Sequence, residues 1–277
     1  MAAAFAAQPS APPATTTATT YSPPSSALLL LCVSTGLIDS LTFAISGVWC
    51  AFVTGTTVQL GMDIPSLLAC LSSTQLDYAA LVHFASTPAS ERLAALTGFL
   101  FGGYAGSRLP SWVTPAGSSL LQATLLAGAS ALVLFPTGIP VHLPYPHSTL
   151  GLVSSSMALQ AVLVQRFATP YATSVAWTSV WLNAVATGKR RWQKFVGISA
   201  VVGGAIAGAA IMHFGKDGKD DKKHGDTLRN ENSAEREDKE KAELVRRVGI
   251  GLAIAAALKV GIAGIFWRRG RVVPRSS

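Results

Sequence analysis

The feature that most constrains this chain is the near absence of charge from the greater part of its sequence. Between Met1 and Gly188 the formally charged residues are only Arg92, Arg108, Arg166, Asp39, Asp63, Asp77 and Glu91. Ordinary soluble domains are about one quarter charged. The mean hydropathy of the whole chain is +0.40 in spite of its polar tails. The sequence therefore predicts an all-α protein, a polytopic transmembrane helix bundle.

Several apolar stretches are long enough to cross a membrane, since a helix needs about 20 residues to span a ~30 Å hydrocarbon core. One stretch is interrupted by Asp63 and Pro65 and another is short, so we expect about seven spans, within a range of about six to eight. The candidate stretches are 27–52, 53–71, 93–109, 120–135, 149–165, 172–186, 195–214 and 248–267.

The composition divides the rest of the chain. Residues 1–26 are mostly Ala, Thr, Ser and Pro, without a charged side chain, which is typical of a disordered tail. The bundle is expected over 27–214, a charged hydrophilic insert over 215–247, an additional transmembrane helix over 248–267 and a basic tail over 268–277. The insert is a soluble spacer or a docking site for a partner. The start of the chain lacks the basic residues of a secretory signal or a presequence, so no cleaved signal peptide is expected.

Basic residues next to the spans predict the orientation. One cluster lies at 189–194 and another follows the last stretch at 268–275, and the positive-inside rule places both in the cytoplasm, with the insert opposite. With six spans before Lys189, the amino terminus is cytoplasmic too. Arg108 and Arg166 are then expected on the outer side, against the rule. Because the positive charge gathers at membrane-flanking loops, no nucleic-acid partner is expected.

Asp39 lies inside the first apolar stretch. On a helix over 35–52 it falls on a face of small and polar side chains, whereas Leu37, Ile38 and Leu41 fall on an apolar face. We expect the first face in the protein interior and the second against lipid. An ionised Asp at mid-membrane costs at least ~2.5 kcal/mol, so this carboxyl group is protonated, hydrogen-bonded or paired. Structural hydrogen bonding and the handling of protons, ions or polar solutes both stay open.

A Thr-Gly-Thr-Thr cluster follows at 54–57, where glycine weakens the helix and hydroxyl groups can cap a new amino terminus or line a cavity. Similar Thr and Ser residues follow Pro170, so the chain has the pattern of two related halves, as transporter folds do. Two half-helix amino termini facing one cavity would favour an anionic solute. Hydroxyl groups that only join helices are the alternative. The candidate residues of a solute or ion pathway are Asp39, Thr54, Gly55, Thr56, Thr57, Gln59, Gln160, Arg166 and Asn183.

Two glycine motifs predict close helix packing. Gly98, Gly102 and Gly106 form GxxxGxxxG, and Gly204 with Gly208 forms GxxxG. Such faces can also join two copies of the chain as a homo-oligomer. At Gly102 we expect leucine to impair folding and alanine to be mild.

The chain resembles the YoaK-like family of multi-pass membrane proteins, whose function is not established. The resemblance rests on GLIDSLTF (36–43), FVTGTTVQLG (52–61), GFLFGGYAG (98–106) and MALQ (157–160), with Arg166 downstream. The sequence departs from the family at Thr56, where the family tends to have Asn, and at Ala161, where Asn is usual. Both departures remove amides from the expected interior. The resemblance implies a compact bundle and no particular reaction.

No nucleophile triad, phosphate loop or HExxH motif occurs, and the cysteines lack the spacing of a metal site or a disulfide framework. We therefore expect no catalytic residue, cofactor or metal. We interpret the chain as a transporter-like or permease-like protein for a small solute or ion, embedded in a lipid bilayer whose identity the sequence does not indicate. The alternatives are a non-transporting scaffold and an embedded enzyme that acts on a lipophilic substrate, with Asp39 as acid or base.

Overall fold

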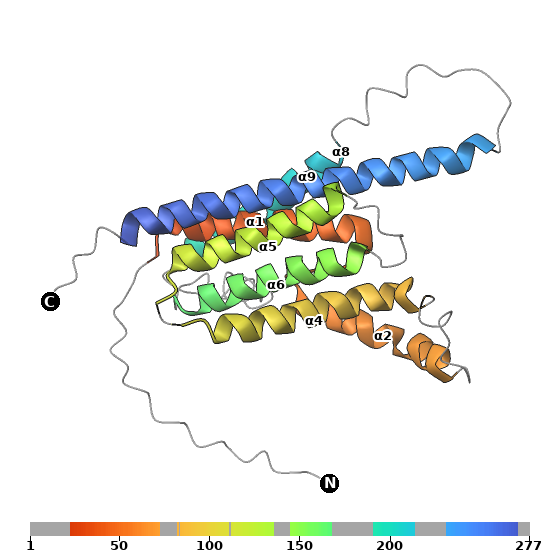
Figure 1. Cartoon of the computed structure of the whole chain (residues 1–277). Helices are drawn as coiled ribbons and strands as arrows, with labels where there is room; N and C mark the ends of the chain where they lie inside the picture. The colour runs from red at the N-terminus through yellow and green to blue at the C-terminus, as the bar shows by residue number, and fades with distance from the viewer. Residues whose placement is uncertain are drawn as a thin grey trace, which may run out of the picture.

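The computed structural model describes residues 23–72, 82, 84–110, 112–135, 145–167, 191–213 and 231–270. All regular elements in these ranges are helices, as predicted (Figure 1). The helices are α1 (Ser25–Ser46), α2 (Val53–Ser72), α4 (Pro88–Ser107), α5 (Pro115–Leu134), α6 (Tyr145–Gln165), α8 (Arg191–His213) and α9 (Glu231–Gly270).

Five of the described helices are long and apolar enough to cross a membrane, so this is a multi-pass membrane protein. Their apolar parts are Ser25–Ser46, Pro115–Leu134, His147–Gln165, Phe195–His213 and Lys239–Arg269. Two further expected stretches, 53–71 and 93–109, correspond to α2 and α4, which are not among these five. The expected stretch 172–186 lies outside the described residues.

Helices α4 and α6 pack through glycine with their backbones in contact. A Cβ atom built on Gly98 would lie 2.3 Å from the carbonyl oxygen of Gly151, and one on Gly102 would lie 2.4 Å from that of Ser155. Because the contacts advance together along both helices, α4 and α6 run parallel. The Ser155 hydroxyl also donates to the Gly98 carbonyl at 2.7 Å. A methyl group at Gly102 does not fit without a backbone shift, so the expectation that alanine is mild there is wrong.

Helices α1 and α8 form a second close and parallel pair. A Cβ atom on Gly204 would lie 2.1 Å from the Val33 carbonyl oxygen, and one on Gly208 would lie 1.9 Å from the Ser40 hydroxyl oxygen. The two glycine motifs therefore each meet a helix of the same chain. Any contact between two copies through these faces would have to displace that helix.

Helix α9 is a single helix of 40 residues that lies along α5 and α1 (Figure 1). The expected boundary between the insert and the last span at residue 248 falls inside it. Leu37, Ile38 and Leu41 of α1 are buried in one cluster with Leu252 and Ala255 of α9. The expectation that this face of α1 meets lipid is wrong, because α9 covers it.

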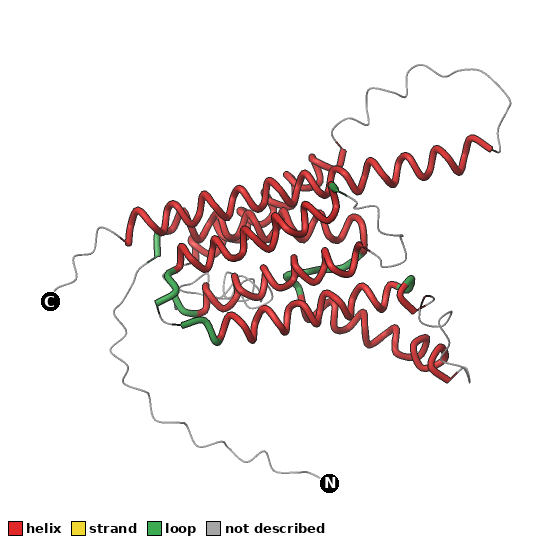
Figure 2. Tube along the Cα trace, viewed as in Figure 1, coloured by secondary structure: helices red, strands yellow, loops and turns green. Residues whose placement is uncertain are grey.

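The chain breaks after α1 and turns back into the bundle. Helix α1 ends at Ser46 because Gly47 takes a left-handed conformation (φ 65°), which glycine adopts without steric cost. The first expected span, which continued to Phe52, is therefore too long. Residues 47–52, here called the re-entrant segment, run back toward the middle of the bundle, where α2 begins (Figure 2).

Helix α2 then returns toward the end of the bundle at which α1 finished. Its first turn shares a small cavity with Ala95 and Leu96 near the middle of α4, and its Asp63 forms a salt bridge with Arg92 near the start of α4. Helix α2 is therefore antiparallel to α4 and runs outward. The chain enters and leaves the re-entrant segment from the same end of the bundle.

This path places the basic residues at the ends of α4, α6 and α9 and at the start of α8 together at one end of the bundle, here called the basic end. Helices α1, α5 and α8 begin there and α4, α6 and α9 end there (Figure 1). The basic end carries Arg108, Arg166, Arg191, Lys194, Arg268 and Arg269. The expectation that Arg108 and Arg166 lie opposite the other clusters is wrong, because α2 does not cross back. The positive-inside rule now predicts a cytoplasmic position for the whole basic end.

Candidate functional site

Asp39 holds the re-entrant segment in place. Its Oδ1 atom accepts a hydrogen bond from the Ala51 N–H at 2.8 Å, and the residue is only 8% exposed. Asp39 lies seven residues before Ser46 in α1, which is about 10 Å from that end of the helix at 1.5 Å per residue. The bond therefore fixes the segment well inside the bundle.

The first turns of α2 satisfy further backbone groups of the segment. The buried Thr56 hydroxyl donates to the Trp49 carbonyl at 2.8 Å, and the Gln59 amide nitrogen lies 3.5 Å from the Gly47 carbonyl oxygen. Backbone polar groups at membrane depth need such internal partners, because lipid offers none. Asp39, Thr56 and Gln59 thus meet at one place, around residues 47–51.

The other members of the Thr-Gly-Thr-Thr cluster do not face this place. Thr54 and Thr57 are exposed, and the Thr57 hydroxyl donates to the Val53 carbonyl of its own helix at 2.8 Å. Gly55 lies against Phe52, since a Cβ atom there would come within 2.5 Å of the phenyl ring. Only Thr56 of the cluster is buried.

A pocket of about 520 Å³ borders Asp39. Asp39 contributes a carboxyl group to the lining of this pocket, and Ser40 contributes a hydroxyl group. The stacked rings of Phe43 and Trp49, whose centroids lie 4.3 Å apart, form part of the pocket wall. It lies between α1, the re-entrant segment and α8. The residues that line it are Gly36, Asp39, Ser40, Phe43, Ala44, Trp49, Phe52, Val201 and Ala205. The arrangement is an apolar pocket with one carboxylate at its border.

Gln160 belongs to a different polar cluster. Its amide oxygen accepts from the ammonium group of Lys259, and its amide nitrogen donates to the Thr35 hydroxyl at 2.9 Å. Lys259 also donates to the Gln122 amide oxygen at 2.9 Å, and all three side chains are fully buried. The sequence signal for this cluster was a lysine inside the apolar run AIAAALKVGIAG, but nothing in the sequence indicated its partners.

Arg166 also lies apart from Asp39. Its guanidinium group donates to the Gly106 carbonyl in the last turn of α4 at 3.0 Å, which satisfies one of the unpaired carbonyl groups of a helix end. Gly106 itself lies against Leu159 and Val162. Arg166 therefore joins α6 to α4 at the basic end. The last candidate, Asn183, lies outside the described residues.

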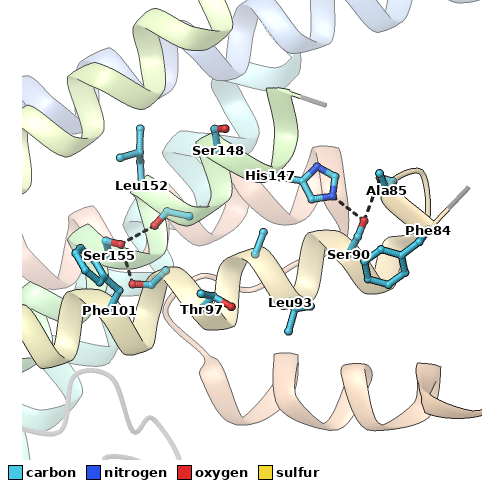
Figure 3. Close-up of a pocket in the computed structure, with 13 residues that line it drawn as sticks. Phe84, Ala85, Ser90, Leu93, Thr97, Phe101, His147, Ser148, Leu152 and Ser155 are labelled. Carbon is cyan, nitrogen blue, oxygen red and sulfur yellow. Dashed lines mark hydrogen bonds between the residues drawn. The ribbon is translucent and has the colours of Figure 1, made fainter. Parts of the chain in front are cut away.

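A second pocket of about 830 Å³ lies between α4 and α6 (Figure 3). At its border Ser90 Oγ and His147 Nε2 lie 2.6 Å apart, an arrangement that a hydrolytic enzyme could use. The Ser90 hydroxyl also donates to the carbonyl oxygens of Thr87 (2.7 Å) and Ala85 (3.1 Å). These backbone acceptors compete for its proton, so the geometry indicates a hydroxyl group that holds the preceding turn against the start of α4 rather than an activated nucleophile.

A comparison with protein-family models matches residues 27–218 to a model described as "Protein of unknown function (DUF1275)". This match covers the greater part of the chain and ends before α9. No curated protein and no solved structure matches the chain.

Proposed function

We propose that this chain, which belongs to the DUF1275 family of membrane proteins of unknown function, carries a small polar solute or ion across the membrane beside Asp39. The observation that supports this most is the re-entrant segment, whose backbone is bound by Asp39 and borders a pocket. Transporters commonly form their binding sites at broken helices. Non-helical backbone at membrane depth is tolerated only where it is buried in protein or lines a cavity.

The pocket, its two polar side chains and the start of α2 each contribute to the proposed pathway. The pocket of about 520 Å³ falls in the size range of ordinary small-molecule sites. Asp39 supplies a carboxylate, Ser40 supplies a hydroxyl group, and the amino terminus of α2 contributes partial positive charge. The matching break expected in the second half, after Pro170, lies outside the described residues.

The test measures whether water reaches the pocket in the membrane. In a background in which Cys32, Cys50 and Cys70 are replaced by alanine, one variant carries Ala44→Cys, at the pocket wall, and its control carries Ala207→Cys, exposed on α8 but not at the pocket. Sealed vesicles are treated with membrane-impermeant methanethiosulfonate reagents of either charge.

A solute pathway predicts rapid modification of the Ala44→Cys variant and slow modification of the Ala207→Cys control, which faces lipid. The preferred sign of reagent would indicate the charge of the solute. Equally slow modification of both cysteines would contradict the proposal and favour the alternative function, a non-transporting scaffold. In that alternative the bond from Ala51 to Asp39 serves packing alone.

A further inference from the structure

Lys259 lies at the centre of the bundle with 0% exposure. Its ammonium group donates to the amide oxygens of Gln122, at 2.9 Å, and Gln160. Among the described residues no carboxylate forms a salt bridge with it. A charged side chain at membrane depth is costly unless polar groups replace its hydration shell. Here two neutral amide oxygens do so.

The two amides are turned so that their oxygen atoms point to one position. The Gln160 amide nitrogen is held by the Thr35 hydroxyl at 2.9 Å and the Leu31 carbonyl at 3.3 Å. The Gln122 amide nitrogen lies 3.5 Å from the Ser118 hydroxyl oxygen. Since ammonium only donates hydrogen bonds, the atom facing it on each amide must be the oxygen. The position between them is therefore shaped for a cation.

The amide groups that accept the hydrogen bonds and the ammonium group that donates them come from different parts of the chain. Gln122 lies on α5, Gln160 on α6 and Thr35 on α1, all within the residues 27–218 that match the family model. Lys259 lies on α9, beyond that match. The residues that accept the hydrogen bonds thus lie within the matched range, whereas Lys259 is supplied by a helix beyond it.

We propose that the amide oxygens of Gln122 and Gln160, which adjacent hydroxyl groups hold in orientation, form a binding site for a small monovalent cation, and that Lys259 is a tethered occupant of this site. Neutral oxygen ligands suit alkali and ammonium-type ions, as backbone carbonyls do in potassium-selective pores. Calcium and magnesium sites in proteins typically include carboxylates, and none of the described residues brings one to this site. The proposal concerns a different place from the Asp39 pocket and does not rest on the function proposed there.

The test empties the site and offers it free cations. The full-length chain with Lys259→Ala is purified in detergent, and its thermal unfolding is followed in ammonium, methylammonium, potassium or sodium chloride. Choline chloride at equal ionic strength is the control, because choline is too large for the site. Lys259→Met is the matched variant, since its uncharged side chain refills the space.

The proposal predicts that Lys259→Ala lowers the unfolding temperature and that at least one small cation restores part of the loss. A cation at ten times its Kd would raise the ratio of folded to unfolded protein about elevenfold. The unsubstituted chain and Lys259→Met should not respond, and Gln160→Leu added to Lys259→Ala should abolish the response. A response to ammonium-type ions alone would indicate a site that needs N–H donors, whereas a response to alkali ions as well would indicate a general monovalent-cation site.

No cation-specific response of Lys259→Ala, or an equal response of Lys259→Met, would overturn the proposal. If Lys259→Ala does not accumulate as folded protein, a double-mutant cycle between Gln160 and Lys259 tests whether the amide holds a cation. Gln160→Leu should destabilise the chain strongly when Lys259 is present and much less beside Lys259→Met. Additive effects of these two substitutions would show that the amide does not hold a cation.

Discussion

Two neighbouring glycines of α4 should respond in opposite ways to the same substitution. A Cβ atom at Gly102 would lie 2.4 Å from the Ser155 carbonyl oxygen and 2.6 Å from the Ser155 Cα atom. At Gly103 the nearest neighbour, the Ala158 Cβ atom, is 4.0 Å away. Alanine at Gly103 therefore fits the existing space, whereas alanine at Gly102 must separate α4 from α6.

The expected changes in the free energy of unfolding follow from three effects. Alanine is favoured over glycine within a helix by about 1 kcal/mol, at both positions. Overpacking at Gly102 costs about 1–3 kcal/mol. Separation of the helices also strains the bond from Ser155 to the Gly98 carbonyl, now 2.7 Å, which is worth about 1 kcal/mol. Gly102→Ala should thus be destabilising by about 1–3 kcal/mol, and Gly103→Ala stabilising by up to about 1 kcal/mol.

The assay is reversible unfolding of both full-length variants in mixed micelles, with Gly102→Leu as a more severe reference. The expected result is a difference of about 1–4 kcal/mol in the free energy of unfolding, with opposite signs relative to the unsubstituted chain. Equal changes for the two alanine variants would refute the close approach of α4 and α6.

Three further predictions concern the re-entrant segment and the orientation. Asp39→Asn should fold but lose solute-driven swelling of reconstituted vesicles across a panel of small solutes. Asp39→Leu should lose folding, because leucine cannot accept the hydrogen bond from the Ala51 N–H. Full activity of the Asn variant would exclude a role for the charge of Asp39. Thr56→Val should lower the free energy of unfolding by about 1 kcal/mol, because the hydrogen bond to the Trp49 carbonyl is lost. The exposed control, Thr57→Val, should change the free energy of unfolding little. Equal effects of the two substitutions would contradict a structural role for the Thr56 hydroxyl. Reporter fusions after residues 188 and 277 should be cytoplasmic and one after 226 should not; a cytoplasmic reporter at 226 would mean that α9 does not cross the membrane.

The sequence predicted the helical membrane class and the close-packed glycines, because both follow from local composition and spacing. It did not predict where α1 ends, since Gly47 lies in a long, mostly apolar run and resembles a packing glycine. Only the bond from Ala51 to Asp39 and the contacts of Thr56 mark the turn back into the bundle, and they exist only in the folded chain. The same error placed Arg108 and Arg166 on the wrong side.

The candidate pathway residues divide in the structure for a related reason. Asp39, Thr56 and Gln59 are close in sequence and meet at the re-entrant segment. Gln160 was predicted beside them but pairs with Lys259, which lies 99 residues further along the chain. Spacing within one helix cannot reveal a partner on a helix so distant in sequence.

The most direct test of the central claim, that α1 and α2 form a re-entrant unit, is the side from which two positions can be labelled. Ser72→Cys marks the end of α2 and Pro110→Cys follows the end of α4, each in the background without native cysteines. The structure predicts that a membrane-impermeant thiol reagent modifies residue 72 from the outer side and residue 110 only from the cytoplasmic side. Labelling of residue 72 from the cytoplasm and of residue 110 from outside would mean that α2 crosses the membrane, and would contradict the re-entrant segment.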